Sequence, residues 1–153
     1  MRISFDLDDT LICPQENVPA EPNPVPLLLR LWWHEPLRLG TCDLIKALEQ
    51  RGFEVCIYTT SYRSPCYIRL WLYFYGIRVS KIINQTIHNA CLNRASNGFL
   101  PSKNPAAFGI PIHVDDSAGV KLEGDRYGFE VIVVSPQDRN WTEKILQQVP
   151  HLA

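Results

Sequence analysis

The carboxylates near the start of the chain are its strongest candidates for chemistry. Asp6, Asp8 and Asp9 lie within four residues of one another, directly after a short apolar segment that begins at Ile3. Carboxylates this close repel one another unless a cation lies among them, and Mg²⁺ is commonly held by one or two protein carboxylates with waters and substrate phosphate. The cluster therefore indicates a metal site, but because Asp is also common in solvated turns and helix caps, the motif alone leaves both interpretations open.

Further polar sites follow apolar segments or lie in the loops beside them. In chain order these sites are Thr59-Thr60-Ser61, then Lys103 between two prolines, then Asp115-Asp116. In open α/β sheets, ligands bind at the carboxyl ends of the strands, near the point where the strand order reverses. All of these sites therefore fall where a ligand is expected in such a sheet.

The ordered set resembles the haloacid dehalogenase-like (HAD) superfamily of phosphatases that use an aspartate as nucleophile. That family has Asp-x-Asp-x-Thr at the first strand, Ser or Thr ending the second, Lys or Arg before the fourth, and an acidic pair ending the fourth. The matching residues are Asp6, Asp8 and Thr10, followed by Thr59, Lys103, Asp115 and Asp116. The match keeps this order over nearly the whole chain.

The resemblance implies a role for each acidic residue. Asp6 would be the nucleophile that forms an aspartyl-phosphate, and Asp8 would protonate the leaving oxygen and then activate water. Mg²⁺ is the implied cofactor, with the Asp6 carboxylate, the Asp8 backbone carbonyl and Asp115 as ligands. Asp116 would contribute to the metal site through water.

The resemblance also implies roles for the hydroxyl groups and the lysine. Thr59 would donate a hydrogen bond to a phosphoryl oxygen, with Thr60 as the alternative, and Lys103 would offset the charge of the substrate and of the nucleophile. Thr10 is expected to brace the loop, and Asp9 to serve the turn.

The intervals between the motifs bear on the substrate. Larger members of the superfamily carry a cap domain after the first motif or between the second and third, whereas here these intervals hold a Pro-rich loop, one helix and elements of the fold itself. We therefore predict a small capless domain whose open site suits a macromolecular substrate, or one enclosed by a partner chain. The Pro-rich residues 13–36 are the candidate flap or lid.

Two functions other than phosphatase stay open. A phosphoacceptor receiver domain also uses an acidic pocket with Thr and Lys, but it would place its acceptor Asp after a middle strand, where this chain has Thr59. A non-catalytic interaction protein on the same fold is the other alternative, because a fold does not dictate function. Such a protein is expected to lack Asp6 or Asp8, and both are present.

Composition narrows the class of protein. The 153 residues suit one domain with a single core, and 15 basic against 16 acidic residues give no clear nucleic-acid footprint. No apolar run approaches the ~18 residues of a membrane helix, and a signal peptide has no room ahead of Asp6. The five cysteines are scattered and odd in number. Free thiols and a cytoplasmic location are therefore expected, with Cys13 as a bystander near the site.

The elements that position these residues follow from apolar patterns and from cap residues. Strands are expected over 3–7, 53–58, 79–84, 110–114 and 129–134, and helices over 41–51, 65–75, 86–94 and 141–148. Thr41 and Ser64 are the expected N-caps of the first two helices, Asn140 and Glu143 form a capping-box pattern at the last, and Asn97-Gly98 suggests a turn. The alternation predicts a single Rossmann-like, three-layer α/β domain over 1–153 with a mainly parallel sheet.

Two features leave more than one interpretation open. Six prolines between residues 13 and 36 exclude regular helix or central strand over 14–26, but the leucines and tryptophans of residues 27–33 are too apolar to be left free. We expect them to pack on the domain or on a partner, with core packing preferred. Arg63 lies beside the Thr59 motif, and it is either a substrate contact or a solvated turn residue.

Overall fold

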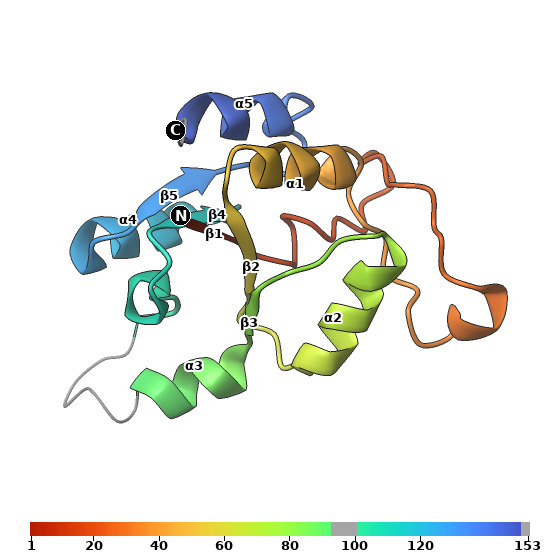
Figure 1. Cartoon of the computed structure of the whole chain (residues 1–153), viewed down its shortest axis with the longest axis horizontal. Helices are drawn as coiled ribbons and strands as arrows, with labels where there is room; N and C mark the ends of the chain where they lie inside the picture. Colours follow the sequence, from red (N-terminus) through yellow and green to blue (C-terminus); the bar gives the residue numbers. More distant parts are fainter. Residues whose placement is uncertain (93–100, 151–153) are drawn as a thin grey trace.

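Five parallel strands form one sheet in the computed structural model, which describes residues 1–92 and 101–150 (Figure 1). The strands are β1 (Arg2–Phe5), β2 (Glu54–Tyr58), β3 (Lys81–Ile83), β4 (Ile112–Asp115) and β5 (Glu130–Val133), in the order β3-β2-β1-β4-β5. Every pair of neighbours is parallel. Because β1 is central and the order reverses between β1 and β4, the crevice beyond their carboxyl ends is the expected ligand site.

Helices cover both faces of this sheet. They are α1 (Thr41–Gln50), α2 (Pro65–Phe74), α3 (Gln85–Leu92), α4 (Ala118–Tyr127) and α5 (Trp141–Gln148), with 3₁₀ turns η1 (Leu27–Leu29) and η2 (Pro105–Phe108). In β2, Val55 and Ile57 join the large apolar cluster shared with α1, α2 and α5, whereas Cys56 and Tyr58 face the opposite side with η2. This three-layer α/β architecture, in which residues 1–92 and 101–150 form no cap domain, confirms the predicted fold class. None of the described helices is long and apolar enough to cross a bilayer.

A side-chain cap marks the start of α2, whereas α1 and α5 begin without one. Ser64 accepts a hydrogen bond from Tyr67 N at 3.1 Å and Pro65 occupies the first turn of α2, as predicted. The expected N-cap Thr41 was wrong by one residue, because Gly40 takes that position with a φ of 90° and Thr41 donates its hydroxyl to Arg38 O. The expected capping box of α5 was also wrong, since the Asn140 side chain makes no cap hydrogen bond.

Helix α4 was not predicted from the sequence. Its two glycines, Gly119 and Gly124, and its weak amphipathic pattern hide it, and only Val120 and Gly124 are buried along it. Gly124 is required for packing, because a Cβ atom there would lie 2.6 Å from Phe129 O. α3 begins one residue before its predicted start, and the predicted Asn97-Gly98 turn lies outside the described residues.

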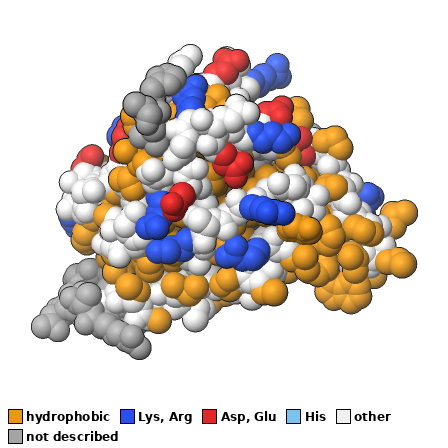
Figure 2. Space-filling view, in the orientation of Figure 1, with side chains coloured by type: hydrophobic (Ala, Val, Ile, Leu, Met, Phe, Trp, Pro, Cys, Tyr) orange, Lys and Arg blue, Asp and Glu red, His pale blue; other side chains and the backbone are white. Residues whose placement is uncertain are grey.

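Residues 14–26 contain no α-helix or strand, as predicted, and the Pro-rich segment reaches away from the sheet to η1 (Figure 1). Trp33 packs on α2, with ring centroids 5.8 Å from Tyr67 and 5.7 Å from Phe74. The preferred expectation of core packing was wrong for the side chains at the tip. Exposed apolar side chains gather there (Figure 2), namely Leu27, Leu28, Leu31 and Trp32, which are 62–84% exposed.

Candidate active site

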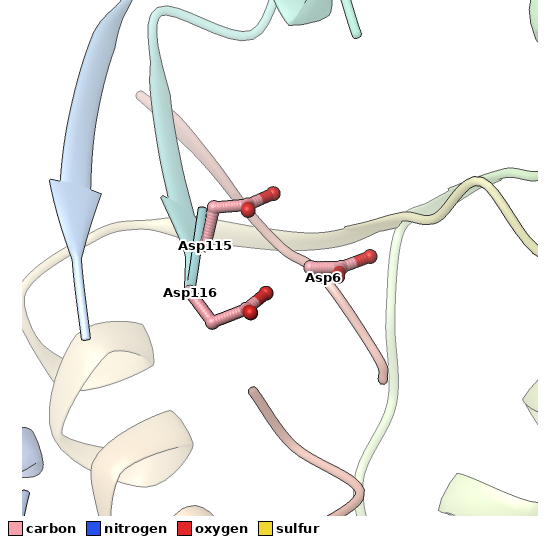
Figure 3. Close-up of side chains that lie close together, drawn as sticks. All are labelled: Asp6, Asp115 and Asp116. Atoms are coloured by element: carbon pink, nitrogen blue, oxygen red, sulfur yellow. The ribbon is translucent and has the colours of Figure 1, made fainter. Parts of the chain in front are cut away.

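Three carboxylates converge at the point where the strand order reverses. β1 and β4 are paired with Phe5 opposite Val114, so Asp6 emerges beside Asp115, the last residue of β4, and Asp116 follows. Ligand oxygens of the three residues lie within 4.8 Å of one another, and Figure 3 shows the side chains pointing in the same direction. The strand register therefore assembles residues that are more than a hundred positions apart in the sequence.

Lys103 brings a positive charge into this cluster. Its Nζ lies 2.8 Å from Asp6 Oδ1 and donates a hydrogen bond to Asp115 Oδ2 at 2.5 Å, and the lysine is only 2% exposed. The backbone holds it there, because Lys103 N donates to Glu123 and Asn104 N donates to the Tyr58 hydroxyl. The ammonium is thus fixed between the two buried carboxylates rather than free on a surface loop.

The surroundings separate the acidities of the three carboxyl groups. Burial raises the pKa of Asp6 to about 6 against the opposing charge of Lys103, and the nearby Asp115 adds to the rise. Burial would also raise the pKa of Asp115, but the hydrogen bond from His113 and the charge of Lys103 outweigh it, so that this pKa is lowered. Burial and Asp115 raise the pKa of Asp116. Asp115 is therefore the most firmly ionised member of the cluster.

His113 lies in the candidate site but was not predicted from the sequence. Its Nε2 lies 2.9 Å from Asp115 Oδ2 and its Nδ1 lies 2.8 Å from Ser4 Oγ, the residue opposite it in β1. Burial lowers the pKa of His113 to about 4, so the ring is neutral at pH 7. Nε2 then donates to the carboxylate and Nδ1 accepts from the Ser4 hydroxyl, which fixes the orientation of Asp115. The available signal was the spacing of two along a strand, which puts His113 and Asp115 on the same face.

Asp8 lies apart from the carboxylate cluster. Its two oxygens each accept a hydrogen bond of 2.9 Å from the guanidinium of Arg63, which also donates to Glu35. Among the described residues, the side chain of Asp8 is not part of the candidate metal cluster, and its predicted role through the backbone carbonyl stays a prediction. Arg63 is thus held by two carboxylates rather than solvated in a turn, and Glu35 had no signal in the sequence.

The remaining predicted residues lie around the turn after β1 and at the end of β2. Thr59 is buried and its Oγ1 accepts from Ser61 N at 3.1 Å, which leaves its own hydroxyl hydrogen available, whereas Thr60 is exposed. Asp9 has a φ of 58°, the left-handed conformation that Asp tolerates better than most residues, in keeping with a role in the turn. Thr10 is fully buried inside that turn. Their predicted roles in substrate binding and bracing stay predictions.

Two hollows lie near this edge of the sheet. One, of about 260 Å³, is lined by Asp8, His34 and Arg63 among others. The larger, of about 490 Å³, is lined by Arg38 and Trp141 and contains none of the predicted site residues. Arg38 donates to the carbonyls of Ser135, Pro136 and Asp138 and stacks on Trp141, so it braces the fold there. Of these two hollows, the smaller is therefore the one lined by a predicted site residue, Asp8.

The comparisons with known proteins rest on structure. No protein-family model and no curated protein matches the sequence. Similar solved structures include a chain from a Pnkp1/Rnl/Hen1 complex, with a TM-score of 0.53 and 15% identity, over 86% of this chain and 45% of that one. They also include a predicted HAD-like family hydrolase from Porphyromonas gingivalis, with a TM-score of 0.50 and 11% identity, over 97% of this chain and 98% of that one. The HAD domain of the effector Lem4 from Legionella pneumophila is similar with a TM-score of 0.50 and 12% identity, over 99% of this chain and 94% of that one.

The coverage differs between these neighbours. The chain spans less than half of the first neighbour but nearly the whole of the two HAD proteins. At 11–15% identity such likeness establishes the arrangement of the chain and leaves the chemistry to the site itself. The protein has the HAD-like fold.

Proposed function

We propose that this protein is a magnesium-dependent phosphohydrolase that cleaves a phosphomonoester through an aspartyl-phosphate on Asp6. One observation carries the proposal: Asp6, Asp115 and Asp116 offer oxygens within 4.8 Å of one another at the carboxyl edge of the sheet, with Lys103 buried among them. Phosphoryl transfer brings an anionic nucleophile to an anionic phosphoryl group. Here the nucleophile, Asp6, and a compensating positive charge, Lys103, lie at the same place.

The carboxylate cluster fits a hard divalent cation. Its donors are all carboxylate oxygens, the ligand type that Mg²⁺ prefers, and the buried Oδ1 of Asp6 has Lys103 Nζ, 2.8 Å away, as its sole polar partner among the described residues. Asp6, Asp115 and Asp116 would hold the ion, with the Asp8 carbonyl as the further ligand expected from the sequence. When bound, Mg²⁺ neutralises charge on the phosphoryl oxygens and aligns them with the nucleophile.

The side chains of this chain account for the rest of the mechanism. Asp6, with a pKa of about 6, is mostly ionised at neutral pH and attacks phosphorus, while Lys103 offsets the repulsion between the two anions. Thr59 donates its hydroxyl to a phosphoryl oxygen. Asp8 gives a proton to the leaving oxygen and then accepts one from the water that hydrolyses the aspartyl-phosphate.

The absence of a cap domain among the described residues supports a substrate that shields the site itself. A macromolecular phosphoester, or a substrate enclosed by a partner chain over the Pro-rich segment, fits this geometry. The five cysteines carry free thiols, which supports the cytoplasm as the location.

Turnover of an aryl phosphate tests the proposal. We expect hydrolysis that needs Mg²⁺, stops with EDTA and is lost in Asp6→Asn, because an amide is no nucleophile. Asp8→Asn should lower turnover by about 10²–10⁴-fold and lengthen the life of the phosphoenzyme. Asp9→Asn is the matched control, since it removes a carboxylate from the same turn and Asn tolerates the same backbone conformation.

Two outcomes would contradict the phosphohydrolase. Full turnover by metal-free protein would remove the role of Mg²⁺. A native phosphoenzyme that persists for hours, unchanged by Asp8→Asn, would point to the alternative function, a non-hydrolytic phosphoacceptor.

A further inference from the structure

The guanidinium of Arg63 is held between two carboxylates that come from different loops. Its Nη1 and Nη2 each donate a hydrogen bond of 2.9 Å to Asp8, and its Nε and Nη2 donate to Glu35. These contacts use both donor edges of the planar guanidinium. Hydrogen bonds to Asp8 are the largest influence that raises the pKa of Arg63, so the group stays a cation.

The two carboxylates are not held equally. The Glu35 side chain is 16% exposed, it accepts a further hydrogen bond from the Tyr67 hydroxyl at 3.1 Å, and its backbone carbonyl accepts from Trp71. The Asp8 side chain is 50% exposed, and Arg63 is its only hydrogen-bond partner among the described residues. Glu35, which Tyr67 and Trp71 of α2 hold in place, therefore anchors the guanidinium, while Asp8 is the partner that can be exchanged.

The edge that Asp8 occupies is shaped for an oxyanion. Two parallel N–H groups match the two oxygens of a carboxylate or a phosphate, and a carboxylate already lies on them. The hollow of about 260 Å³ adjoins this edge, and its charged or titratable lining residues are Arg63, the exposed His34 and the carboxylates Asp8, Asp9 and Glu35. An anionic group of a ligand has room to reach the same two donors.

We propose that the Nη1/Nη2 edge of Arg63 binds a second anionic group of the substrate, which displaces Asp8 and frees it to act on the leaving oxygen. This rests on the proposed function and names its substrate class: a phosphomonoester whose leaving group carries a phosphate or a carboxylate. An oxygen of Asp8 that accepts from the guanidinium cannot at the same time hand its proton to a leaving group. Asp8 must therefore leave Arg63 for the reaction to proceed.

The position of Asp8 indicates why the second anion belongs to the leaving group. The phosphoryl group under attack must lie at Asp6 and Lys103, which are buried. Asp8 acts on the leaving oxygen, so its binding partner Arg63 lies on the leaving-group side, toward the solvent. A substrate with a neutral leaving group leaves the ion pair intact and is expected to react slowly.

Three matched three-carbon substrates test this proposal: the monophosphate of propane-1,3-diol, its bisphosphate, and the phosphate ester of 3-hydroxypropanoate. In Mg²⁺ buffer we expect kcat/KM per phosphoryl group to be about tenfold or more higher for the anion-bearing substrates than for the monophosphate. A preference for both identifies a general anion site, and a preference for the bisphosphate alone identifies a phosphate site. Equal kcat/KM for all three overturns the proposal.

Variants show whether Arg63 causes the preference. The quantity to compare is the ratio of kcat/KM per phosphoryl group for an anion-bearing substrate to that for the monophosphate. Arg63→Gln should bring this ratio close to one. Arg63→Lys, which keeps a charge beside Glu35 but lacks two parallel donors, should lower it as well. Arg69→Gln is the control, because Arg69 is exposed on α2 and donates to Val79 O away from the site. Its ratio should stay that of the native protein, and a native ratio in both Arg63 variants overturns the assignment.

Binding separates this inference from the proposed function. If the native protein hydrolyses none of the three substrates, the proposed phosphohydrolase function is wrong. Calorimetry with the bisphosphate then tests by itself whether Arg63 binds an anion. Binding that is weakened about tenfold or more by Arg63→Gln supports the site. Equal binding to both proteins overturns it.

Discussion

Replacing Lys103 by Met tests whether the buried ammonium holds the carboxylate cluster together. Lys103 pairs with Asp6 and Asp115, and the three side chains are between 1% and 9% exposed. Methionine has a similar length and no charge, so the substitution removes the cation with little change in packing volume. The two carboxylates are then left buried without their shared positive partner.

The expected loss follows from what each carboxylate retains. Asp115 keeps hydrogen bonds from His113 and from Ser117 N, but Oδ1 of Asp6 has no other hydrogen-bond partner among the described residues. Removing one partner of a buried ion pair costs about 3–5 kcal/mol, and we expect about 3 kcal/mol because Asp6 can take up a proton. For a domain of this size that corresponds to a Tm lower by about 6–12 °C.

The loss should depend on pH with a definite sign. In the native protein the folded pKa of Asp6 is raised to about 6, and the charge of Lys103 opposes that rise, so removing Lys103 raises this pKa further. A carboxyl whose folded pKa is raised favours the folded state at low pH, and that contribution is lost as pH rises through the folded pKa. The deficit of Lys103→Met should therefore be larger at pH 8 than at pH 5, by about 1.4 kcal/mol for each unit of additional pKa rise.

Urea unfolding in EDTA, followed by the fluorescence of the buried Trp71 and Trp141, measures this free energy at both pH values. The control is Lys121→Met, which removes an exposed lysine from α4 and should change the free energy of unfolding by less than about 0.5 kcal/mol. A deficit of Lys103→Met below about 1 kcal/mol at pH 8, or one that is equal at pH 5 and pH 8, would refute the electrostatic reasoning.

Two further predictions concern α4, the helix that holds the lysine loop. Glu123 accepts hydrogen bonds from Ser102 N, the Ser102 hydroxyl and Lys103 N. Glu123→Gln should therefore lower kcat/KM for an aryl phosphate by about tenfold and the free energy of unfolding by about 1–2 kcal/mol. Native values of both quantities would show that other contacts hold the loop in place. Gly124→Ala should lower the free energy of unfolding by about 1–3 kcal/mol in denaturant, because the new Cβ would lie 2.6 Å from Phe129 O. The control Gly119→Ala should not destabilise the protein, since a Cβ there would have no contact shorter than 3.4 Å. Equal effects of the two substitutions would contradict the packing argument.

The sheet was predictable from the sequence because its signals are local. Buried parallel strands appear as short apolar runs, and each of the five predicted strands overlaps an observed one. Ser64-Pro65 fixed the start of α2 for the same reason, since a cap and an N1 proline act within one turn. The order of the polar motifs then placed Asp6 and Asp115 at the same edge, because parallel strands end together.

α4 shows where local signals fail. Its glycines lower helix propensity, and Gly124 is present for the close approach of β5 rather than for the helix itself. Such a contact depends on two elements that meet only in the folded chain. Because α4 was not predicted, the role of Glu123 was not predicted either. Glu123 lies on that helix and accepts a hydrogen bond from Lys103 N in the candidate site.

Asp6 and Asp8 belong to one sequence motif, but the motif does not predict how differently their side chains are placed. They are two residues apart, yet Asp6 is 6% exposed in line with β1, whereas the Asp8 side chain is half exposed and bound to a residue 55 positions away. The difference arises because Glu35, carried by the Pro-rich segment, fixes Arg63 where Asp8 can reach it. That segment therefore contributes Glu35 to the surroundings of Asp8, whether or not it also serves as the predicted lid. A change in the segment that moves Glu35 alters the freedom of Asp8 without touching the motif that contains it.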